Sequence, residues 1–445
     1  MSPDTTPPLH RSIGLVRATA MVVGTIIGAS IFVQPSVITG EMHSVAGVVV
    51  VWTLAGVLTL VGALICAELA SAFPESGGVY VFLREEYGPA VGFLWGWAMF
   101  WSMHSGIIAA IAVVFARFVG YFTPLSDGGI RVVAALAIVA LSAVNYVGVA
   151  LGSALQAAFT ITKVAAIAAV VTAGFWLGAA LPAHFVSAAG APPVSVGGFA
   201  AAVAAGLFAF GGWHMVTYTA EETRDPRRVL PRALAIGALV VTAAYVALNA
   251  VYLYVLPVDR VIASDRVAAD AAAVLAGPRS AAAIAALVAA SAFGALAGIV
   301  LTGPRVYFSM ARDGLLFRWA GAVHARFGTP HRAIVLQAVW SVVLVATGTY
   351  RALFTRVVFT EWLFFAALAV GLVSLRRRAG YAPGYRVAGA PAVPLVFAAV
   401  ALCVALSQIV AHPRDSAVGL FLVLAGLPVY GWWAPRRPSP GALPS

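Results

Sequence analysis

Small residues interrupt the first long apolar segment of the chain at Gly28, Ala29 and Ser30. A helix in lipid must satisfy every backbone N–H and C=O group internally, so a break is tolerated only where the backbone is buried in protein or lines a cavity. A helix that restarts near Ile31 would direct unpaired N–H groups and the positive end of its dipole at this point, which suits a carboxylate. The alternative is close packing of two membrane helices through the pattern Gly24-x-x-x-Gly28.

Two adjacent glycines, Gly211 and Gly212, lie in the middle of a later apolar segment. Each weakens a helix by about 1 kcal/mol relative to alanine. A helix that breaks here would leave the carbonyls of Phe208, Ala209 and Phe210 free, and carbonyls at the C-terminal end of a half-helix suit an ammonium group. An unbroken, tightly packed helix is the alternative. Interrupted helices in corresponding positions of two halves predict a transporter binding site.

The basic residues comprise 26 arginines and one lysine, Lys163, which lies inside an apolar run. An ionisable residue within a membrane helix is by default a functional hypothesis. A lysine near a helix end can extend its ammonium group to the interface, but Lys163 lies too far from either end of its predicted segment. We therefore expect a functional role for this side chain.

The composition predicts an all-α polytopic membrane protein. Of the 445 residues, 62% are hydrophobic and only 10% are charged, whereas soluble domains have about 25% charged residues. Twelve spans of about 20–25 residues would use most of the length. The expected spans are 14–38, 44–72, 89–122, 130–150, 154–179, 199–219, 233–256, 280–308, 332–348, 355–375, 393–411 and 417–433.

The two breaks fall in the first and sixth spans. This predicts a five-plus-five inverted repeat with broken helices 1 and 6, followed by two extra C-terminal helices. We expect a cytoplasmic interfacial amphipathic helix within 74–88 and a short surface helix within 257–279. The predicted segments are an N-terminal tail 1–13, a first repeat 14–179, a second repeat 199–375, helices 11 and 12 at 393–433, and a disordered C-terminal tail 434–445.

The arginines predict the orientation in the cell membrane. In this arrangement 18 of the 26 arginines lie on the side of the N-terminus and 8 on the other side, so the positive-inside rule places both termini in the cytoplasm. The net charge of +11 is spread over short loops and does not predict a nucleic-acid partner. Cys66 and Cys403 both lie in apolar segments, so we expect no disulfide to an ancillary chain and no obligatory ancillary subunit.

Four motifs resemble those of the amino acid–polyamine–organocation superfamily, and within it the L-type amino acid transporters and their bacterial relatives. Their order and spacing make the resemblance specific, and it covers nearly all of residues 13–378. The motifs are Gly24-Thr-Ile-Ile-Gly-Ala-Ser-Ile-Phe32, Phe208-Ala-Phe-Gly-Gly-Trp213, Glu221-Glu222 with Asp225-Pro226, and Phe293-Gly294 with the stretch from Arg305 to Gly314.

The resemblance implies a substrate with a free α-carboxylate and a free α-amino group. The carboxylate would meet main-chain N–H groups at the first break, the ammonium would meet carbonyls near both breaks, and Phe208 would be a gate. The chain has Ala29-Ser30 where the family usually has serine-glycine. The expected substrate-binding residues are Ile26, Ile27, Gly28, Ala29, Ser30, Phe208, Ala209, Phe210, Gly211, Gly212, His214 and Glu361.

Lys163 matches the fifth-helix lysine of sodium-independent members of this family. The resemblance implies that its ammonium occupies the place of a sodium ion between the first and eighth helices, with Ser291 as a candidate partner. The ammonium would act either as a fixed cation or as a group that exchanges protons with the solvent.

Two positions bear on the choice of substrate. His214 follows the tryptophan of the sixth helix, where the family often has asparagine. A carboxylate at Glu361 would favour a cationic or hydrogen-bonding substrate side chain; the alternatives are an ion pair, for instance with Arg356, and a vestibule position. We expect a neutral, hydrogen-bonded state for His104 and His214, and a structural salt bridge at Glu68.

The leading hypothesis is a sodium-independent amino acid transporter that works by alternating access, as an exchanger or a proton-coupled symporter. A polyamine or other amine transporter is the alternative. A channel would need a continuous polar pore, and the polar residues here are isolated. An enzyme is not expected, because the sequence has no metal-ligand spacing, nucleophile motif or clustered carboxylates. We expect no cofactor and no metal.

Overall fold

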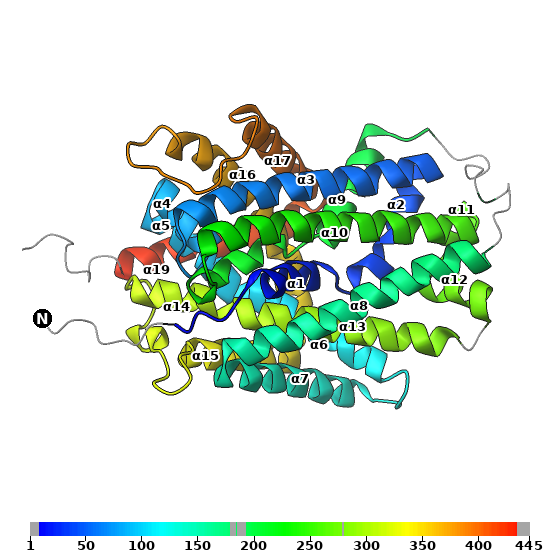
Figure 1. The fold of residues 1–445 in the computed structure, drawn as a ribbon, viewed down its shortest axis with the longest axis horizontal. Coiled ribbons are helices and arrows are strands. Elements are labelled where there is room, and N and C mark those ends of the chain that lie inside the picture. The colour runs from blue at the N-terminus through cyan, green and yellow to red at the C-terminus, as the bar shows by residue number, and fades with distance from the viewer. Residues whose placement is uncertain (1–8, 179–183, 185–192, 278–279, 434–445) are drawn as a thin grey trace, which may run out of the picture.

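The computed structural model describes residues 9–178, 184, 193–277 and 280–433. Its regular elements in this part of the chain are helices, and one isolated β-bridge joins Ile13 to Thr223. The long helices run along the longest axis of the molecule (Figure 1). The predicted disorder of the tail 434–445 lies outside the described residues.

The predicted all-α class with twelve spans is confirmed. Ten helical stretches are long and apolar enough to cross a membrane, and the interrupted first span and the 17-residue α15 complete the set. The first five spans are α1 (Leu15–Ile26) with the 3-10 helix η1 (Ser30–Phe32) and α2 (Gln34–Met42), α3 (Val45–Ala72), α5 (Pro89–Ala98) with the π-helical turn η2 (Met99–Met103) and α6 (His104–Val119), α7 (Asp127–Val147) and α8 (Val149–Leu177).

The remaining seven spans follow in the second half of the chain. They are α9 (Val196–Ala209) with the 3-10 helix η4 (Trp213–Glu222), α10 (Pro226–Val255), α13 (Ser280–Thr302) with α14 (Pro304–Arg312), α15 (His331–Thr347), α16 (Tyr350–Leu375), α17 (Ala392–Ala411), and α18 (Pro413–Leu424) with α19 (Gly426–Trp433). A short 3-10 helix, η5 (Arg318–Gly321), precedes α15.

Both predicted breaks are present. The chain is non-helical between α1 and η1 and again between α9 and η4. Gly212 has a φ of 97°, in the left-handed region that glycine enters at little cost. A Cβ atom at Gly212 would lie 3.3 Å from the carbonyl oxygen of Thr25. The alternative of an unbroken sixth helix is therefore wrong, and the second break lies directly against the first span.

The two glycines of the first span have different roles. A Cβ atom at Gly24 would lie 2.2 Å from Oγ1 of Thr160 on α8, so this glycine permits close helix packing. At Gly28, the nearest atom to such a Cβ would be 3.8 Å away, in Ala295. The packing and the break that the Gly24-x-x-x-Gly28 pattern suggested both occur, at different residues.

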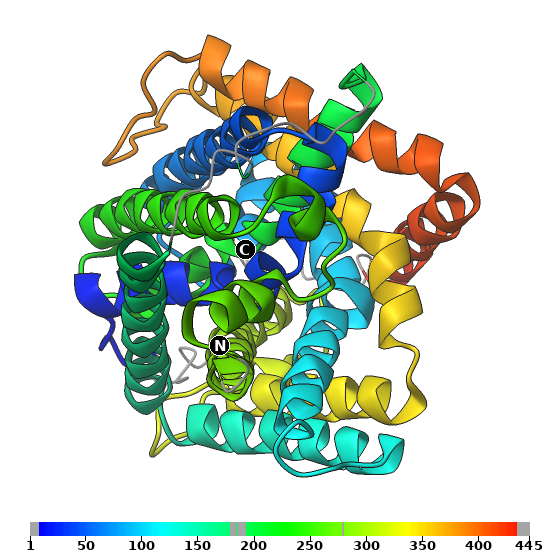
Figure 2. The ribbon, with the colours of Figure 1, turned by 90° about the vertical axis from the view of Figure 1, so that its right-hand side faces the viewer.

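The broken segments lie inside the bundle. The blue first span crosses its interior in the end-on view (Figure 2), and α1 packs against α10, α8, α13 and η4. α10 also runs along α3 (Figure 1). The expected surface helix within 257–279 is present as two short helices, α11 (Val258–Ile262) and α12 (Val267–Ala276), at the end of the bundle away from the N-terminus (Figure 1).

The predicted interfacial helix within 74–88 needs a correction. A helix is present there, α4 (Val79–Tyr87), but six of its nine residues are buried, including Glu86. It packs against α5 and α16. The charged pattern of the segment suggested a helix with one face on the lipid headgroups, whereas its neighbours cover most of it.

Candidate functional site

The two breaks are in direct contact. The Thr25 hydroxyl in α1 lies 3.2 Å from the Gly212 carbonyl oxygen at the second break. The Ser30 hydroxyl lies 3.5 Å from the carbonyl oxygen of Ala209, the last residue of α9. Residues almost 190 positions apart in the chain therefore form one site at the centre of the bundle.

The first break offers free backbone donors. Among the hydrogen bonds of the described residues, none has the N–H group of Gly28, Ala29 or Ser30 as its donor. Gly28 is buried, and the other two residues are half-buried. Successive N–H groups without a protein acceptor are the kind of donors that bind an anion.

A tyrosine that the sequence analysis missed joins the two breaks. The hydroxyl of Tyr245 on α10 lies 3.1 Å from the Ile26 carbonyl oxygen and 3.2 Å from that of Ala209. A tyrosine hydroxyl has one hydrogen, so it donates to one of these carbonyls at a time. The carbonyl of Ala209, which the sequence analysis expected to be free, therefore shares this donor with the carbonyl of Ile26. The sequence showed a tyrosine within an apolar span, but it did not show the direction in which the side chain points.

Two other carbonyl groups of the breaks also have donors. The Phe208 carbonyl accepts from the N–H of Gly211 at 3.1 Å, and the Ile27 carbonyl accepts from Lys163. The ring of Phe210 is buried and lies 4.8 Å from that of Tyr245. The ring of Phe208 is 45% exposed, so of the two phenylalanines only Phe208 presents its side chain to open space.

Lys163 holds the first break in place. Its ammonium on α8 donates to the carbonyl oxygens of Ile27 at 2.7 Å, Gly24 at 3.1 Å and Ser291 at 3.1 Å, and the residue is 1% exposed. The Ser291 hydroxyl on α13 lies 3.2 Å from the Gly28 carbonyl oxygen. The ammonium thus lies between the first and eighth helices, where the sequence analysis expected it, and all three of its hydrogens have an acceptor.

His214 and Glu361 meet on the far side of the second break. His214 Nε2 on η4 lies 3.7 Å from Glu361 Oε1 on α16. The His214 side chain is fully buried, and that of Glu361 is 22% exposed. The suggested ion pair between Glu361 and Arg356 is wrong, because Arg356 donates to Asp415 on α18 at 2.9 Å.

Two expectations for neighbouring groups are met. His104 Nε2 lies 2.9 Å from the Ile299 carbonyl oxygen; a carbonyl only accepts, so this nitrogen carries a hydrogen. The expected hydrogen bond is thus present at His104, but the same expectation for His214 is wrong, because neither of its ring nitrogens makes one within the described residues. Glu68 forms the expected structural salt bridge, with Arg376 at 2.5 and 2.8 Å.

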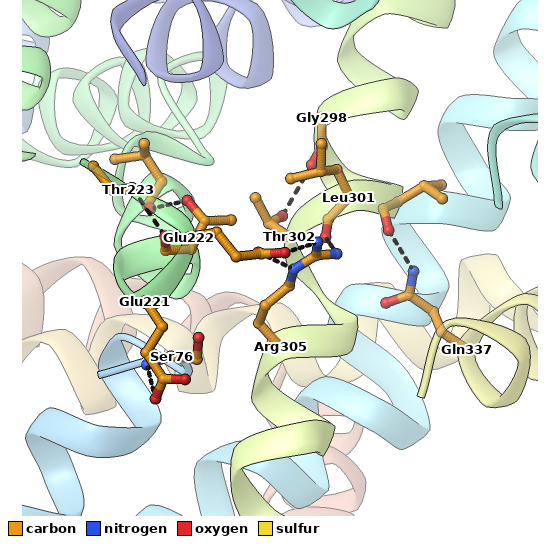
Figure 3. Close-up of polar contacts among 12 residues, drawn as sticks. Ser76, Glu221, Glu222, Thr223, Gly298, Leu301, Thr302, Arg305 and Gln337 are labelled. Carbon is orange, nitrogen blue, oxygen red and sulfur yellow. Dashed lines mark hydrogen bonds and ion pairs between the residues drawn. The ribbon is translucent and has the colours of Figure 1, made fainter. Parts of the chain in front are cut away.

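A buried ion pair joins the end of η4 to α14 (Figure 3). Arg305 on α14 donates through Nε and Nη2 to the Glu222 carboxylate at 2.7 and 2.8 Å, and both side chains are fully buried. Arg305 also donates to the Leu301 carbonyl. Two parallel hydrogen bonds between charged groups fix the relative position of their helices, so the end of η4 is fastened to α14.

The N-terminal segment strengthens this attachment. The N–H groups of Ser12 and Ile13 both lie 3.0 Å from the Glu222 carbonyl oxygen, and the N–H of Arg224 donates to the Ile13 carbonyl at 2.9 Å. Residues 212–220 are buried, whereas Phe208 and Gly211 on the other side of the break are exposed. The accessible surface of the second break therefore lies on the side of α9 and not on the side of η4.

Comparisons with known proteins agree with this architecture. The amino acid permease family matches residues 13–430. The serine/threonine exchanger SteT of Bacillus subtilis is 31% identical over 435 residues, which cover 97% of this chain and 98% of that protein. The human b(0,+)-type amino acid transporter 1 is 32% identical over 378 residues, 83% of this chain and 77% of that protein.

A third relative is the large neutral amino acids transporter small subunit 2 of Oryctolagus cuniculus, 32% identical over 445 residues that cover 95% of this chain and 80% of that protein. These relatives are named as transporters and exchangers and not as enzymes. The protein is a multi-pass membrane protein, and it belongs to the amino acid permease family within the amino acid–polyamine–organocation superfamily.

Proposed function

We propose that the protein is a sodium-independent amino acid transporter of the cell membrane that works by alternating access, as an exchanger or a proton-coupled symporter. The observation that carries this proposal is the contact between two broken helices, with free N–H groups at one break and a buried ammonium beside it. Discontinuous helices in this arrangement are the binding sites of many secondary transporters.

The substrate carboxylate would bind the N–H groups of Gly28, Ala29 and Ser30, which have no acceptor among the described hydrogen bonds. The α-ammonium would bind carbonyl groups at the breaks. Because the Tyr245 hydroxyl donates to only one of two carbonyls at a time, the other remains able to accept from the substrate. Phe208 would cover the bound molecule.

Lys163 would replace a coupling cation. Its three hydrogen bonds join the first break to α13, and a positive charge held by three carbonyls needs no sodium ion to stabilise the break. This contact pattern supports the role of a fixed cation over that of a proton carrier.

The unequal closure of the two ends supports alternating access. The Glu222–Arg305 pair closes the end that carries the chain termini, which we place in the cytoplasm, while Phe208 and Gly211 are exposed on the other side. We propose that this conformation faces outward. Movement to the inward state requires the ion pair to separate, and the substrate shifts the equilibrium only if it binds the two states with different affinity.

A polyamine or other amine is the second candidate substrate. Glu361 favours it, because its carboxylate is partly exposed and lies near an imidazole and not near an arginine. We propose that the protein acts without an ancillary subunit, since both cysteines lie within membrane spans.

The test is uptake of labelled L-serine, L-threonine and L-leucine into sodium-free proteoliposomes. One set is loaded with the unlabelled amino acids, and the other is empty with an inward proton gradient. Uptake only into loaded vesicles identifies an exchanger, and uptake into empty vesicles driven by the gradient identifies a symporter. Uptake in neither set, with uptake of labelled putrescine, would reject amino acids in favour of amines.

Replacement of Lys163 by alanine tests the assigned cation. We expect at least a tenfold loss of exchange, because three carbonyls lose their donor and the first break loses its position. The control is Thr162→Ala on the same helix, whose hydroxyl is exposed and bonds only to its own helix, at Ala158. Unchanged exchange in the Lys163 variant would contradict the role.

A further inference from the structure

A buried acid–base pair lies beside the proposed substrate site and outside the network of Lys163. It consists of Glu361 on α16 and His214 on η4, which are 3.7 Å apart. This distance is too long for a hydrogen bond. The side chain of Glu361 is 22% exposed, whereas that of His214 is fully buried.

The imidazole of His214 has unused hydrogen-bonding capacity on both sides. Neither Nδ1 nor Nε2 makes a hydrogen bond within the part of the chain that the structure describes, although the residue is 0% exposed. Aromatic rings surround it: Trp95 at 5.9 Å, Phe365 at 5.0 Å and Tyr218 at 5.6 Å between ring centres. A buried polar ring without a partner costs free energy, which a proton shared with a neighbouring acid would recover.

Few titratable groups lie near the pair. Tyr218 of η4 and His104 of α6 are close enough to sense the charges of Glu361 and His214, respectively. Cys66 of α3 and Tyr307 of α14 are close enough to act electrostatically on Tyr218. The nearest arginine along α16, Arg356, is paired with Asp415. Among the described residues no ion pair with a lysine or arginine balances the Glu361 carboxylate.

We propose that Glu361 and His214 form a proton-binding site that couples amino acid movement to a proton. This inference rests on the proposed transport function and selects its proton-coupled form. In this step the Glu361 carboxylate, whose side chain is partly exposed, takes up one proton. The resulting O–H donates to a ring nitrogen of His214, and the pair then carries no net charge. Lys163 takes no part in this transfer, since its three donors are used within its own network.

The position of the pair supplies the coupling. Glu361 lies on α16, whereas His214 lies just beyond the break on η4, which belongs to the bundle of helices 1 and 6 that rocks in alternating access. A relative movement of the two elements changes the distance between acid and imidazole. The proton therefore has a different affinity for the two states, which is the condition for a ligand to shift a conformational equilibrium.

The experiment measures proton entry and amino acid exchange separately on the full chain in sodium-free proteoliposomes. A pH-sensitive dye in the lumen reports protons, with the membrane potential clamped at zero, while L-serine, L-threonine or L-leucine is added outside. The wild type is expected to acidify the lumen as the amino acid enters. Glu361→Gln is expected to reduce acidification at least tenfold more than it reduces exchange between loaded vesicles. Glu361→Asp is expected to retain acidification.

Asp415→Asn is the matched control, because it removes an acidic group near α16 outside the pair, and it is expected to keep both activities. If Glu361→Gln does not give a monodisperse protein, His214→Gln is used and is also expected to lose acidification. Exchange without acidification in the wild type would overturn the proton site and leave the transport function standing. Acidification in Glu361→Gln at the wild-type rate would also overturn it. Absence of both activities in the wild type would overturn the transport function itself.

Discussion

At the scale of the residue, single polar side chains replace the helical hydrogen bonds that a broken span has lost. Lys163 satisfies three carbonyl groups near the first break, and Tyr245 donates to a carbonyl at either break. An unsatisfied backbone group in a membrane interior costs several kcal/mol. The breaks are therefore stable because neighbouring helices supply donors at fixed positions, and not because glycine alone allows them.

Glu86 gives a prediction about pH and stability outside the membrane spans. The residue is 6% exposed, and neither carboxylate oxygen makes a hydrogen bond within the described residues. Burial raises the pKa of Glu86 well above its ordinary value, although the charge of Arg378 acts in the opposite direction. The folded protein therefore binds this proton more tightly than the unfolded chain does.

The free energy of unfolding should fall as pH rises from about 4.3, where a free glutamate titrates, through the raised pKa of Glu86. The loss has an upper slope of about 1.4 kcal/mol per pH unit. Glu86→Gln cannot ionise, so its thermal midpoint in detergent should equal that of wild type in acid and exceed it at pH 8. Asp265→Asn, at an exposed position, is the control and should change neither curve. A Glu86→Gln protein with the pH dependence of wild type would contradict the assignment.

At the scale of the element, the two halves of the sixth span are held in different ways. α9 ends at Ala209, and η4 restarts at Trp213 after a residue in the left-handed region. η4 is then fastened at its other end to α14 and to the N-terminal segment. A half-helix with a glycine joint at one end and a buried ion pair at the other is suited to rigid-body movement.

The joint can be tested by alanine substitution at the paired glycines. Gly212→Ala forces a Cβ into the left-handed region, at a cost of roughly 1–2 kcal/mol, and places it 3.3 Å from the Thr25 carbonyl oxygen. We expect exchange to fall at least tenfold. Gly211→Ala meets only the Phe208 carbonyl oxygen, at 3.2 Å, and Gly211 has no positive φ, so its loss should be smaller. If both variants exchange amino acids as fast as wild type, a joint at this position is excluded.

The closure at the other end of η4 allows a comparison of adjacent residues. Glu222→Gln leaves Arg305 buried without a counter-charge, and breaking such a pair typically costs about 3–5 kcal/mol. Glu221 pairs with Arg312, but its side chain is 26% exposed and that of Arg312 is 54% exposed, so Glu221→Gln should cost less than about 1 kcal/mol. Thermal unfolding monitored by fluorescence-detected size exclusion should separate the two variants. Similar midpoints for both would mean that the buried pair does not hold this end closed.

At the scale of the whole molecule, the asymmetric distribution of arginines predicts the direction of insertion. With 18 arginines at one end and 8 at the other, both termini should lie in the cytoplasm. Asp265 and Arg377 are exposed, and they lie on opposite sides in this topology. In a Cys403→Ala background, we expect Asp265→Cys to react with an impermeant maleimide in intact cells and Arg377→Cys to react only after permeabilisation. The reverse pattern would invert the proposed orientation.

The helices and the places where they break could be predicted from local composition. Long apolar runs have few alternatives to membrane helices, because every backbone group must be satisfied within the segment. Small residues at Gly28 and the pair Gly211-Gly212 weaken a helix wherever they occur. Lys163 was identified for the same local reason, since a lysine within an apolar run requires a partner.

Which side chains meet could not be predicted, because it depends on how the helices pack. Tyr245 reaches both breaks, Glu361 faces His214 and not Arg356, and α4 is covered on most sides. These outcomes depend on the rotation of each helix about its axis and on the neighbour that packs against it. In a span that is apolar all round, the sequence carries little information about either. Local chemistry therefore fixed where the chain is interrupted, and packing fixed which side chains serve the interruption.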